Sequence, residues 1–251
     1  MALTISVITA VFNRVDTIGQ ALESVRTQTW QGVEHIVIDG SSTDGTLQVI
    51  EEHRQRLAVF VSEPDGGIYT ALNKGLALAS GDVIGIMHSD DFYADNAVLE
   101  RVACAFSDPL VGGVYGDLDY VARGDPSRII RRWRAGVYTP YRLAWGWMPP
   151  HPTLYLRRSV MAKWGGFDTS MRIAADYDLM LRYLGRAQVR LAYIPEVLVK
   201  MRVGGESNRS LSHVWRKSRE DYIALRRNRV GGVCSLVWKN LSKVPQFFRR
   251  S

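Results

Sequence analysis

The amino-acid sequence predicts an α/β fold, in which a mostly parallel sheet is flanked by helices and a basic helical C-terminal extension follows. Short apolar, largely β-branched segments alternate with segments of helical spacing over residues 3–107, as in parallel strands joined by helices. Polar clusters follow each of the first four strand-like segments. The 251 residues are 46% apolar and 23% charged, which excludes disordered, collagen-like and coiled-coil proteins.

The first half repeats one strand–helix unit. Strands are expected at residues 3–8, 34–38, 58–62 and 82–87, and helices at 15–29, 44–55 and 68–79. Asp16 and Asp44 precede the apolar positions of the first two helices, where acidic residues favour a helix start. Such units predict right-handed crossovers and one doubly wound sheet.

The second half has a less regular pattern. Strands are expected at 111–120, 127–134, 153–156 and near 189–194, with a helix at 174–184. Two further helices are expected from Leu211 onward, separated by Gly231 and Gly232. We therefore divide the chain into a domain of residues 1–210, with halves 1–107 and 108–210, and a C-terminal extension of residues 211–251.

Charge is distributed unevenly along the chain. Residues 1–127 hold 7 Lys and Arg against 18 Asp and Glu, a net charge of −11, whereas residues 128–251 hold 25 against 7, a net charge of +18. The acidic first half indicates chemistry assisted by a cation, and the basic second half indicates an anionic partner. On charge alone, nucleic acid and membrane phosphate are both compatible partners.

Cysteine content and hydropathy indicate a protein of a reducing, cytoplasmic compartment. Cys104 and Cys234 cannot form a disulfide framework. The first residues, MALTISVITAVFNR, lack a basic leader region and are better explained as a core strand than as a secretory signal. No apolar run reaches the roughly 18 to 20 residues that span a bilayer.

The polar residues after the four strand-like segments predict a binding pocket, because ligands of open parallel sheets bind outside the carboxyl ends of the strands. One such cluster alone is a turn or a helix cap, whereas four at one edge form a pocket. In chain order the clusters are Thr9, Ala10, Asn13 and Arg14; DGSSTDGT from Asp39; EPDGG from Glu63; and HSDD from His88.

The pocket carries no glycine-rich phosphate loop, since both G-x-G-x-x-G and G-x-x-x-x-G-K-[ST] are absent from the sequence. Asp90 and Asp91 supply hard oxygen ligands. Mg²⁺ or Mn²⁺ bound by one or two carboxylates completes its shell with water and substrate phosphates, so a metal-held diphosphate is expected. The alternative is that this pair only caps the helix that follows.

Several motifs occur in a fixed order over residues 3 to about 205: SVITAVFNR, IVIDGSSTDGT, SEPDGGIYTALNKGLALASGD, HSDD, HPTLYLRRS, GGFD and AADYDLMLR. This ordered set resembles the inverting family 2 glycosyltransferases of the GT-A fold, particularly bacterial enzymes of exopolysaccharide and lipopolysaccharide assembly. The resemblance implies a Rossmann-like sheet and a nucleotide-diphosphate sugar donor, with UDP the expected nucleotide.

The resemblance also implies residue roles around the nucleotide. The Asp39 carboxylate would accept a hydrogen bond from a uracil N–H, Asp65 would lie against the base, and Lys74 would lie near the donor. The residues that would line the base and ribose are Thr9, Ala10, Asn13 and Asp39.

The family's D-x-D element corresponds to Ser89-Asp90-Asp91. Asp91 would ligate Mn²⁺ or Mg²⁺, and Asp90 would reach the ribose or a metal-bound water. Ser89 leaves one carboxylate fewer than the family pattern, so the strictness of metal dependence is in question.

The family's Glu-Asp catalytic pair falls on Ala175 and Asp176, so only the aspartate is present. Inversion requires one base opposite the leaving diphosphate to take the proton of the acceptor hydroxyl, and Asp176 is the candidate. Asp178 lies two residues further along the same predicted helix. Because residues i and i+2 do not share a helix face, we expect Asp178 to be a capping or ion-pairing residue.

Residues 138–157 are rich in aromatic side chains and look loop-like. One interpretation is a lid over the acceptor, in which Trp147 contacts a sugar face and His151, in the family's His-Pro element, faces the acceptor or the diphosphate. The alternatives are an ordinary core position for Trp147 and a structural hydrogen bond for His151.

Residues 211–251 carry 10 basic and 2 acidic side chains among apolar residues at helical spacing. Basic amphipathic helices bind anionic membrane surfaces, and the alternative is that these helices pack on the catalytic domain. The first interpretation predicts a cytoplasmic enzyme peripheral to the inner face of the cell membrane.

We therefore expect a sugar transferase with a lipid-linked or growing cell-surface glycan as acceptor and Asp176 as general base. A non-catalytic glycan- or nucleotide-sugar-binding protein on the same scaffold is the alternative, because Ser89 and Ala175 depart from the family pattern. A nucleic-acid partner is not expected, because the carboxylates of the first half would repel phosphate unless a metal intervened.

Overall fold

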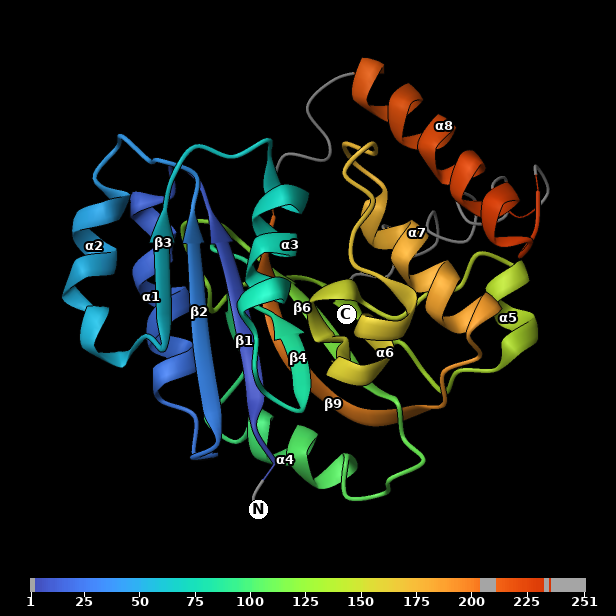
Figure 1. The fold of residues 1–251 in the computed structure, drawn as a ribbon, viewed down its shortest axis with the longest axis horizontal. Coiled ribbons are helices and arrows are strands. Elements are labelled where there is room, and N and C mark those ends of the chain that lie inside the picture. Colours follow the sequence, from blue (N-terminus) through green and yellow to red (C-terminus); the bar gives the residue numbers. More distant parts are fainter. Residues whose placement is uncertain (1–2, 204–210, 233–234, 236–251) are drawn as a thin grey trace.

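A mixed sheet forms the centre of the molecule, and helices cover both of its faces (Figure 1). The computed structural model describes residues 3–203, 211–232 and 235. Within these residues nine strands form one sheet in the order β3-β2-β1-β4-β8-β6-β9-β5, with β7 paired to β6. The predicted α/β fold is confirmed.

The first four strands are parallel and confirm the predicted strand–helix units. Along β1 the side chains alternate: Ile8 packs in one core cluster with Leu72 of α3, and Val7 packs in another with Val25 of α1. Both faces are therefore covered, which explains why these strands are apolar almost throughout. The elements are β1 (Ile5–Val11), α1 (Val15–Arg26), β2 (Val33–Asp39), α2 (Thr46–Glu52), β3 (Val59–Ser62), α3 (Ile68–Leu78) and β4 (Val83–Ile86).

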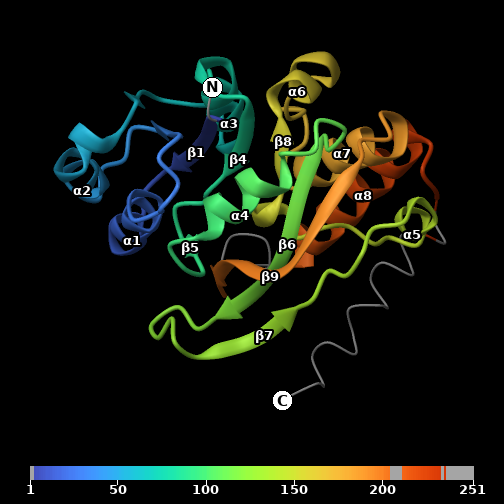
Figure 2. The same cartoon turned by 90° about the horizontal axis from the view of Figure 1, so that it is seen from below.

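The chain after β4 adds short elements that the sequence pattern did not predict, among them β5, α5 and α6. In Figure 2, β7 lies beside β6 at an edge of the sheet. The elements in chain order are β5 (Asp91–Tyr93), α4 (Val98–Ala105), β6 (Gly113–Val121), β7 (Ile129–Trp133), α5 (Pro140–Ala144), β8 (Tyr155–Arg157), α6 (Arg158–Trp164), α7 (Ala175–Leu181) and β9 (Leu191–Arg202).

Strand β9 is much longer than the predicted segment 189–194. It continues to Arg202 because it pairs parallel with β6 and antiparallel with β5. The sequence pattern is interrupted at Pro195, which has no N–H for a ladder hydrogen bond. A register shift opposite Gly116 and Asp117 accommodates the proline.

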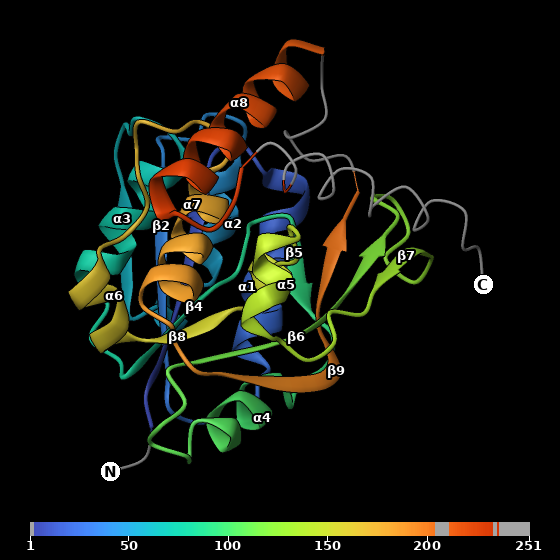
Figure 3. The same ribbon diagram turned by 90° about the vertical axis from the view of Figure 1, so that its right-hand side faces the viewer.

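Helix α8 (Leu211–Asn228) packs across α7, which continues into a π-helical turn at Arg182–Arg186 (Figure 3). Ala224 and Leu225 of α8 are completely buried in the core cluster that contains Leu181 of α7. The inner face of α8 therefore belongs to the domain core. The second predicted C-terminal helix falls outside the described residues, and none of the described helices is long and apolar enough to cross a bilayer.

The contact between β4 and β8 leads to a prediction of stability. A Cβ atom at Gly85 would lie 2.3 Å from Cε1 of Tyr155, whose ring is fully buried. We predict that Gly85→Ala lowers the free energy of unfolding by about 1–3 kcal/mol, the usual range for overpacking a core. Urea denaturation measures the change. Gly124→Ala is the control, because, apart from its chain neighbours, no described residue has a heavy atom within 4 Å of its new Cβ. Equal unfolding midpoints for the two variants would contradict this packing.

Candidate functional site

A cavity of about 1120 Å³ opens beyond the carboxyl ends of β1 and β4. Because these strands are parallel neighbours, the residues that follow them meet at one edge of the sheet. The cavity brings together residues from all four polar clusters and from α7. Predicted site residues in its wall are Ala10, Asn13, Asp65, Asp90, Asp91, His151 and Asp176.

Asn13 joins the loop after β1 to the loop after β2. Its backbone N–H donates to the Ser42 hydroxyl at 2.8 Å, and its side-chain oxygen accepts from the Thr43 N–H at 2.9 Å. Asn13 has a positive φ of 51°, a conformation in which asparagine is enriched among non-glycine residues. Asp65, in the loop after β3, accepts the Gly67 N–H at 2.8 Å and so shapes its own loop.

Two residues expected at the nucleotide lie beneath the cavity wall. Asp39 is completely buried, and its carboxylate accepts hydrogen bonds from the Ser42 N–H at 3.0 Å and from the Ser62 hydroxyl at 2.7 Å. Thr9 is also buried, with its hydroxyl oxygen 3.1 Å from Nε2 of His35. Asp39 therefore orders the loop that ends β2 and leaves the adjacent Gly40 in the wall.

Lys74 and Trp147 also lie outside the set of described residues that line the cavity. The Lys74 ammonium is 2.5 Å from Oε1 of Glu63. The Trp147 indole N–H donates to the Ala135 carbonyl at 2.9 Å, and its ring packs edge-on against Tyr115 with 5.7 Å between centroids. Trp147 thus occupies the core position that was the alternative to a lid.

Asp91 is the most buried acidic side chain in the described wall of the cavity. It is 1% exposed, and Oδ1 accepts only a long hydrogen bond of 3.3 Å from the Arg202 N–H. Oδ2 has no hydrogen-bond partner within the described part of the chain. Burial, and after it the charge of the neighbouring Asp90, raises the pKa of Asp91 well above its ordinary value.

The carboxylate oxygens of Asp90 and Asp91 fit a divalent ion that takes its remaining ligands from a substrate and from water. An unpaired, buried carboxylate oxygen beside a second carboxylate is a hard oxygen site for Mg²⁺ or Mn²⁺. Among the described residues, no group of three or more His, Cys, Asp or Glu side chains is placed to hold a metal alone. A metal here would need further oxygen ligands, which a diphosphate and water can supply.

Asp176 lies in the first turn of α7 and faces the cavity. Its Oδ2 is 3.6 Å from Nδ1 of His151, and the His151 ring meets His88 edge-on with centroids 5.2 Å apart. Burial lowers the pKa of His151 and lowers that of His88 to about 4. Both imidazoles are therefore neutral near pH 7.

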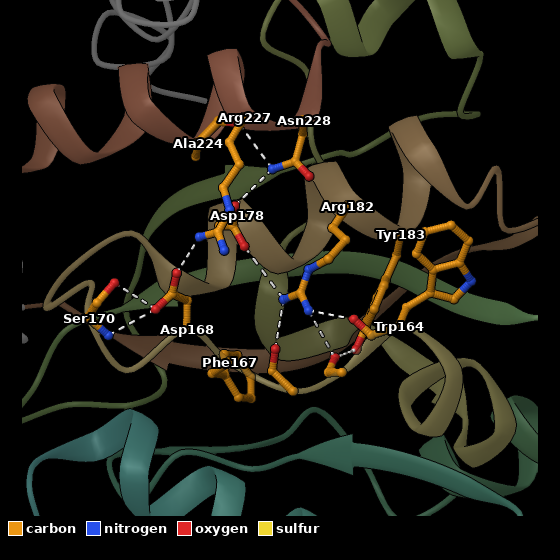
Figure 4. A network of polar contacts seen from close by, with 12 residues as sticks. Trp164, Phe167, Asp168, Ser170, Asp178, Arg182, Tyr183, Ala224, Arg227 and Asn228 are labelled. Atoms are coloured by element: carbon orange, nitrogen blue, oxygen red, sulfur yellow. Dashed lines mark hydrogen bonds and ion pairs between the residues drawn. The ribbon is translucent and has the colours of Figure 1, made fainter.

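Asp178 lies in the contact between α7 and α8 (Figure 4) and is absent from the described wall of the cavity. It is 3% exposed, accepts a hydrogen bond of 2.8 Å from the Asn228 amide, and lies 3.5 Å from the Arg182 guanidinium. The prediction that Asp178 is an ion-pairing residue is confirmed. That the two aspartates face different ways follows from the i, i+2 geometry of the helix.

Sequence reasoning assigned no role to three further residues of the cavity wall, His88, Tyr69 and Arg172. His88 belongs to the HSDD cluster, so its position was available from the sequence. Tyr69 and Arg172 reach the wall through the packing of α3 near the segment before α7, where the Tyr69 hydroxyl donates to the Ile173 carbonyl at 2.8 Å. No local sequence signal indicates such a contact between distant segments.

The chain is similar in sequence to proteins named as glycosyltransferases. An uncharacterized glycosyltransferase of Mycobacterium tuberculosis is 36% identical over 195 residues, which cover 72% of this chain and 69% of the relative. A PGL/p-HBAD biosynthesis glycosyltransferase of Mycobacterium bovis is 27% identical over 208 residues, which cover 81% of this chain and 78% of that protein.

Solved structures share the fold. Staphylococcus aureus TarS 1–349 in complex with UDP-GlcNAc has a TM-score of 0.66 and 20% identity over 91% of this chain and 66% of its own. This chain covers 40% of a longer TarS chain. The mannosyltransferase PcManGT from Pyrobaculum calidifontis in complex with GDP-Man and Mn²⁺ has a TM-score of 0.66 and 18% identity over 100% of this chain and 77% of its own.

The family assignment rests on the sequence match, and the structures show the shared fold. Residues 6–172, about two thirds of the chain, match the family model described as glycosyl transferase family 2. With its GT-A-like sheet, this chain is a glycosyltransferase and belongs to glycosyl transferase family 2.

Proposed function

We propose that the protein transfers a sugar, with inversion, from a UDP-sugar to a hydroxyl group of a lipid-linked or growing cell-surface glycan of the exopolysaccharide or lipopolysaccharide type. The observation that carries the proposal is that Asp176 and the buried Asp91, with its unpaired oxygen, line one cavity. Structural neighbours solved with UDP-GlcNAc, or with GDP-Man and Mn²⁺, support a nucleotide-sugar donor and a divalent metal.

The nucleotide would lie against the wall formed by Ala10, Asn13 and Asp65. Asp39 and Thr9 would act from beneath, because their polar atoms already bond to Ser62, Ser42 and His35. Their part is to fix the loop after β2 against the bound base. Lys74, paired with Glu63, would act on the donor only through the loop after β3.

Asp91, assisted by Asp90, would hold Mn²⁺ or Mg²⁺. When bound, the ion supplies positive charge close to the donor diphosphate, which must leave as an anion. The Arg202 guanidinium donates to the Asp90 carbonyl at 2.6 Å and fixes the turn that carries both carboxylates.

Asp176 would act as the general base. Its carboxylate takes the proton of the acceptor hydroxyl as that oxygen forms a bond to the anomeric carbon. The bond from the anomeric carbon to the diphosphate oxygen breaks at the same time, and its electron pair leaves with the nucleotide. Neutral His151, at 3.6 Å, would orient the Asp176 carboxylate on the acceptor side.

The outer face of α8 would bind an anionic membrane surface, which would place the enzyme at the inner face of the cell membrane. Trp215 is 69% exposed and Tyr222 is 37% exposed, and Arg216, Arg219 and Arg226 of the same helix are also exposed. Aromatic side chains interleaved with arginine are typical of helices that lie in a membrane interface. The buried inner face, with Ala224 and Leu225, shows that α8 also packs on the domain.

If the metal site is assigned correctly, a nucleotide-sugar donor should stabilise the protein against heat more strongly when Mn²⁺ is present. In a thermal-shift screen of UDP-GlcNAc, UDP-glucose and GDP-mannose at about 100 times the dissociation constant, one donor with Mn²⁺ should stabilise the protein by ~2.7 kcal/mol, or about 5–10 °C. Asp91→Asn should lose the Mn²⁺-dependent part of this shift. Asp108→Asn, a half-exposed carboxylate outside the described cavity wall, should keep it. A full Mn²⁺-dependent shift in Asp91→Asn would exclude Asp91 as the ligand.

The general base predicts a change in turnover without a change in donor affinity. Asp176→Asn should lower kcat by about 10² to 10⁴, measured as nucleotide diphosphate released, and leave the dissociation constant of the donor within about twofold. Asp178→Asn is the comparison, because its side chain faces α8. If Asp178→Asn abolishes turnover and Asp176→Asn is nearly as active as wild type, the base is wrongly assigned.

The membrane proposal is tested by charge reversal on α8, since deleting the helix would remove Ala224 and Leu225 and expose the core against which they pack. Arg216→Glu, Arg219→Glu and Arg226→Glu together should weaken binding to phosphatidylglycerol vesicles by about 100-fold, because each surface arginine contributes ~1 kcal/mol. The matched control reverses three exposed arginines of the β6–β7 hairpin, namely Arg123, Arg128 and Arg132. Equal losses in the two triple variants would show that binding follows net charge and not α8.

A further inference from the structure

The segment just before α7 is held by a carboxylate from α8. The Glu220 side chain accepts backbone hydrogen bonds from Ile173 at 2.8 Å and Ala174 at 2.9 Å through Oε2, and from Arg172 at 3.2 Å through Oε1. These three N–H groups precede the first turn of α7, where no side chain of α7 itself supplies a cap. A carboxylate that accepts several N–H groups makes stronger bonds than a neutral acceptor.

The same segment is held from its other side by the donor half of the protein. The Ile173 carbonyl accepts the Tyr69 hydroxyl at 2.8 Å, and Tyr69 is a residue of α3 that lines the cavity. Tyr69 also stacks on Phe167 with 5.5 Å between ring centroids. The peptide groups around Ile173 are therefore bound on one side by α3 and on the other by α8.

Glu220 is itself held by a well-anchored helix. One turn further along α8, Ala224 and Leu225 are completely buried in the core. Asn228 donates to Asp178 of α7, and Arg227 forms an ion pair with Asp168 (Figure 4). The carboxylate thus has little freedom to follow the segment if that segment moves.

We propose that Glu220 is a positioning residue for Asp176: it fixes the backbone of residues 172–174, and so the direction in which the Asp176 carboxylate faces the acceptor. This inference rests on the proposed role of Asp176 as base. Glu220 is absent from the described wall of the cavity, so it acts through the backbone and not on the substrate. Asp176 follows the clamped segment by two residues, and Arg172 and Ile173 of that segment line the cavity themselves.

If Glu220 positions Asp176, losing Glu220 should slow turnover and leave donor binding almost unchanged. Displacing a reacting group by about 1 Å can lower a rate about 100-fold. Glu220→Ala should therefore lower kcat by about 10- to 100-fold, with the donor dissociation constant changed by less than about twofold. Turnover is measured as nucleotide diphosphate released from the donor that gives the largest thermal shift, and affinity by calorimetry with the same donor and Mn²⁺.

Two further variants at the same position test the mechanism. Glu220→Gln should recover most of the turnover, because one amide oxygen can replace Oε2 and accept from both Ile173 and Ala174. Glu220→Asp keeps the charge but draws the carboxylate back by one methylene, so it should be as slow as Glu220→Ala. These two variants keep the test decisive if Glu220→Ala fails to fold.

Arg227→Ala is the matched control on α8. It removes the ion pair with Asp168, which ties the same helix to the domain without touching residues 172–174. It should leave kcat close to the wild-type value. Wild-type turnover in Glu220→Asp, or an equal loss in Arg227→Ala, would overturn the inference. If Asp176→Asn also turns over normally, the proposed base fails as well; if Asp176→Asn is inactive, only the positioning role of Glu220 fails.

Discussion

The proposed chemistry depends on a carboxylate that the fold buries without satisfying it. Asp91 is 1% exposed, receives one long hydrogen bond from the Arg202 backbone and keeps an oxygen with no partner in the described chain. Removing an ionised carboxylate from water without a compensating partner is strongly unfavourable. The folded protein therefore favours either a proton or a cation at this point, and a cation can also bind the diphosphate of a donor.

The sheet places the other groups around Asp91. Parallel pairing of β1 with β2 and β4 brings the loop of Asn13 and the turn of Asp90 to one edge, and antiparallel pairing of β5 with β9 brings Arg202 beside that turn. Asp176 comes from the other half of the chain, on α7, and lines the same cavity. Helix α8 packs on α7 through its buried residues and bonds the backbone just before α7 through Glu220, which is the basis for the proposed positioning role.

Much of this could be predicted from the sequence. The alternation of apolar strands and helices specifies the first half, and the position of polar residues after each strand identifies Asn13, Asp65, Asp90 and Asp91 as wall residues. Which polar side chains remain available to a ligand could not be predicted, because this depends on contacts between distant segments. Asp39 is engaged by Ser62 from the next strand, and its burial is visible only in three dimensions.

The second half was harder to predict for related reasons. Trp147 lies in a loop by sequence pattern but packs on Tyr115 of β6, and β9 crosses a proline that normally ends a strand. The clamp of Glu220 on residues 172–174 joins segments more than forty residues apart and leaves no local signal. Helix geometry predicts that Asp176 and Asp178 point to different faces, and the resemblance to the family's Glu-Asp pair singled out Asp176, which lines the cavity.

The most direct measurement is the position of the metal in a crystal soaked with UDP and Mn²⁺, located by anomalous scattering. We expect a manganese peak within about 2.0–2.2 Å of a carboxylate oxygen of Asp91, with oxygens of the UDP diphosphate among its other ligands. Nucleotide bound in the cavity with manganese away from Asp91, or with the Asp91 carboxylate still without a partner, would contradict the account.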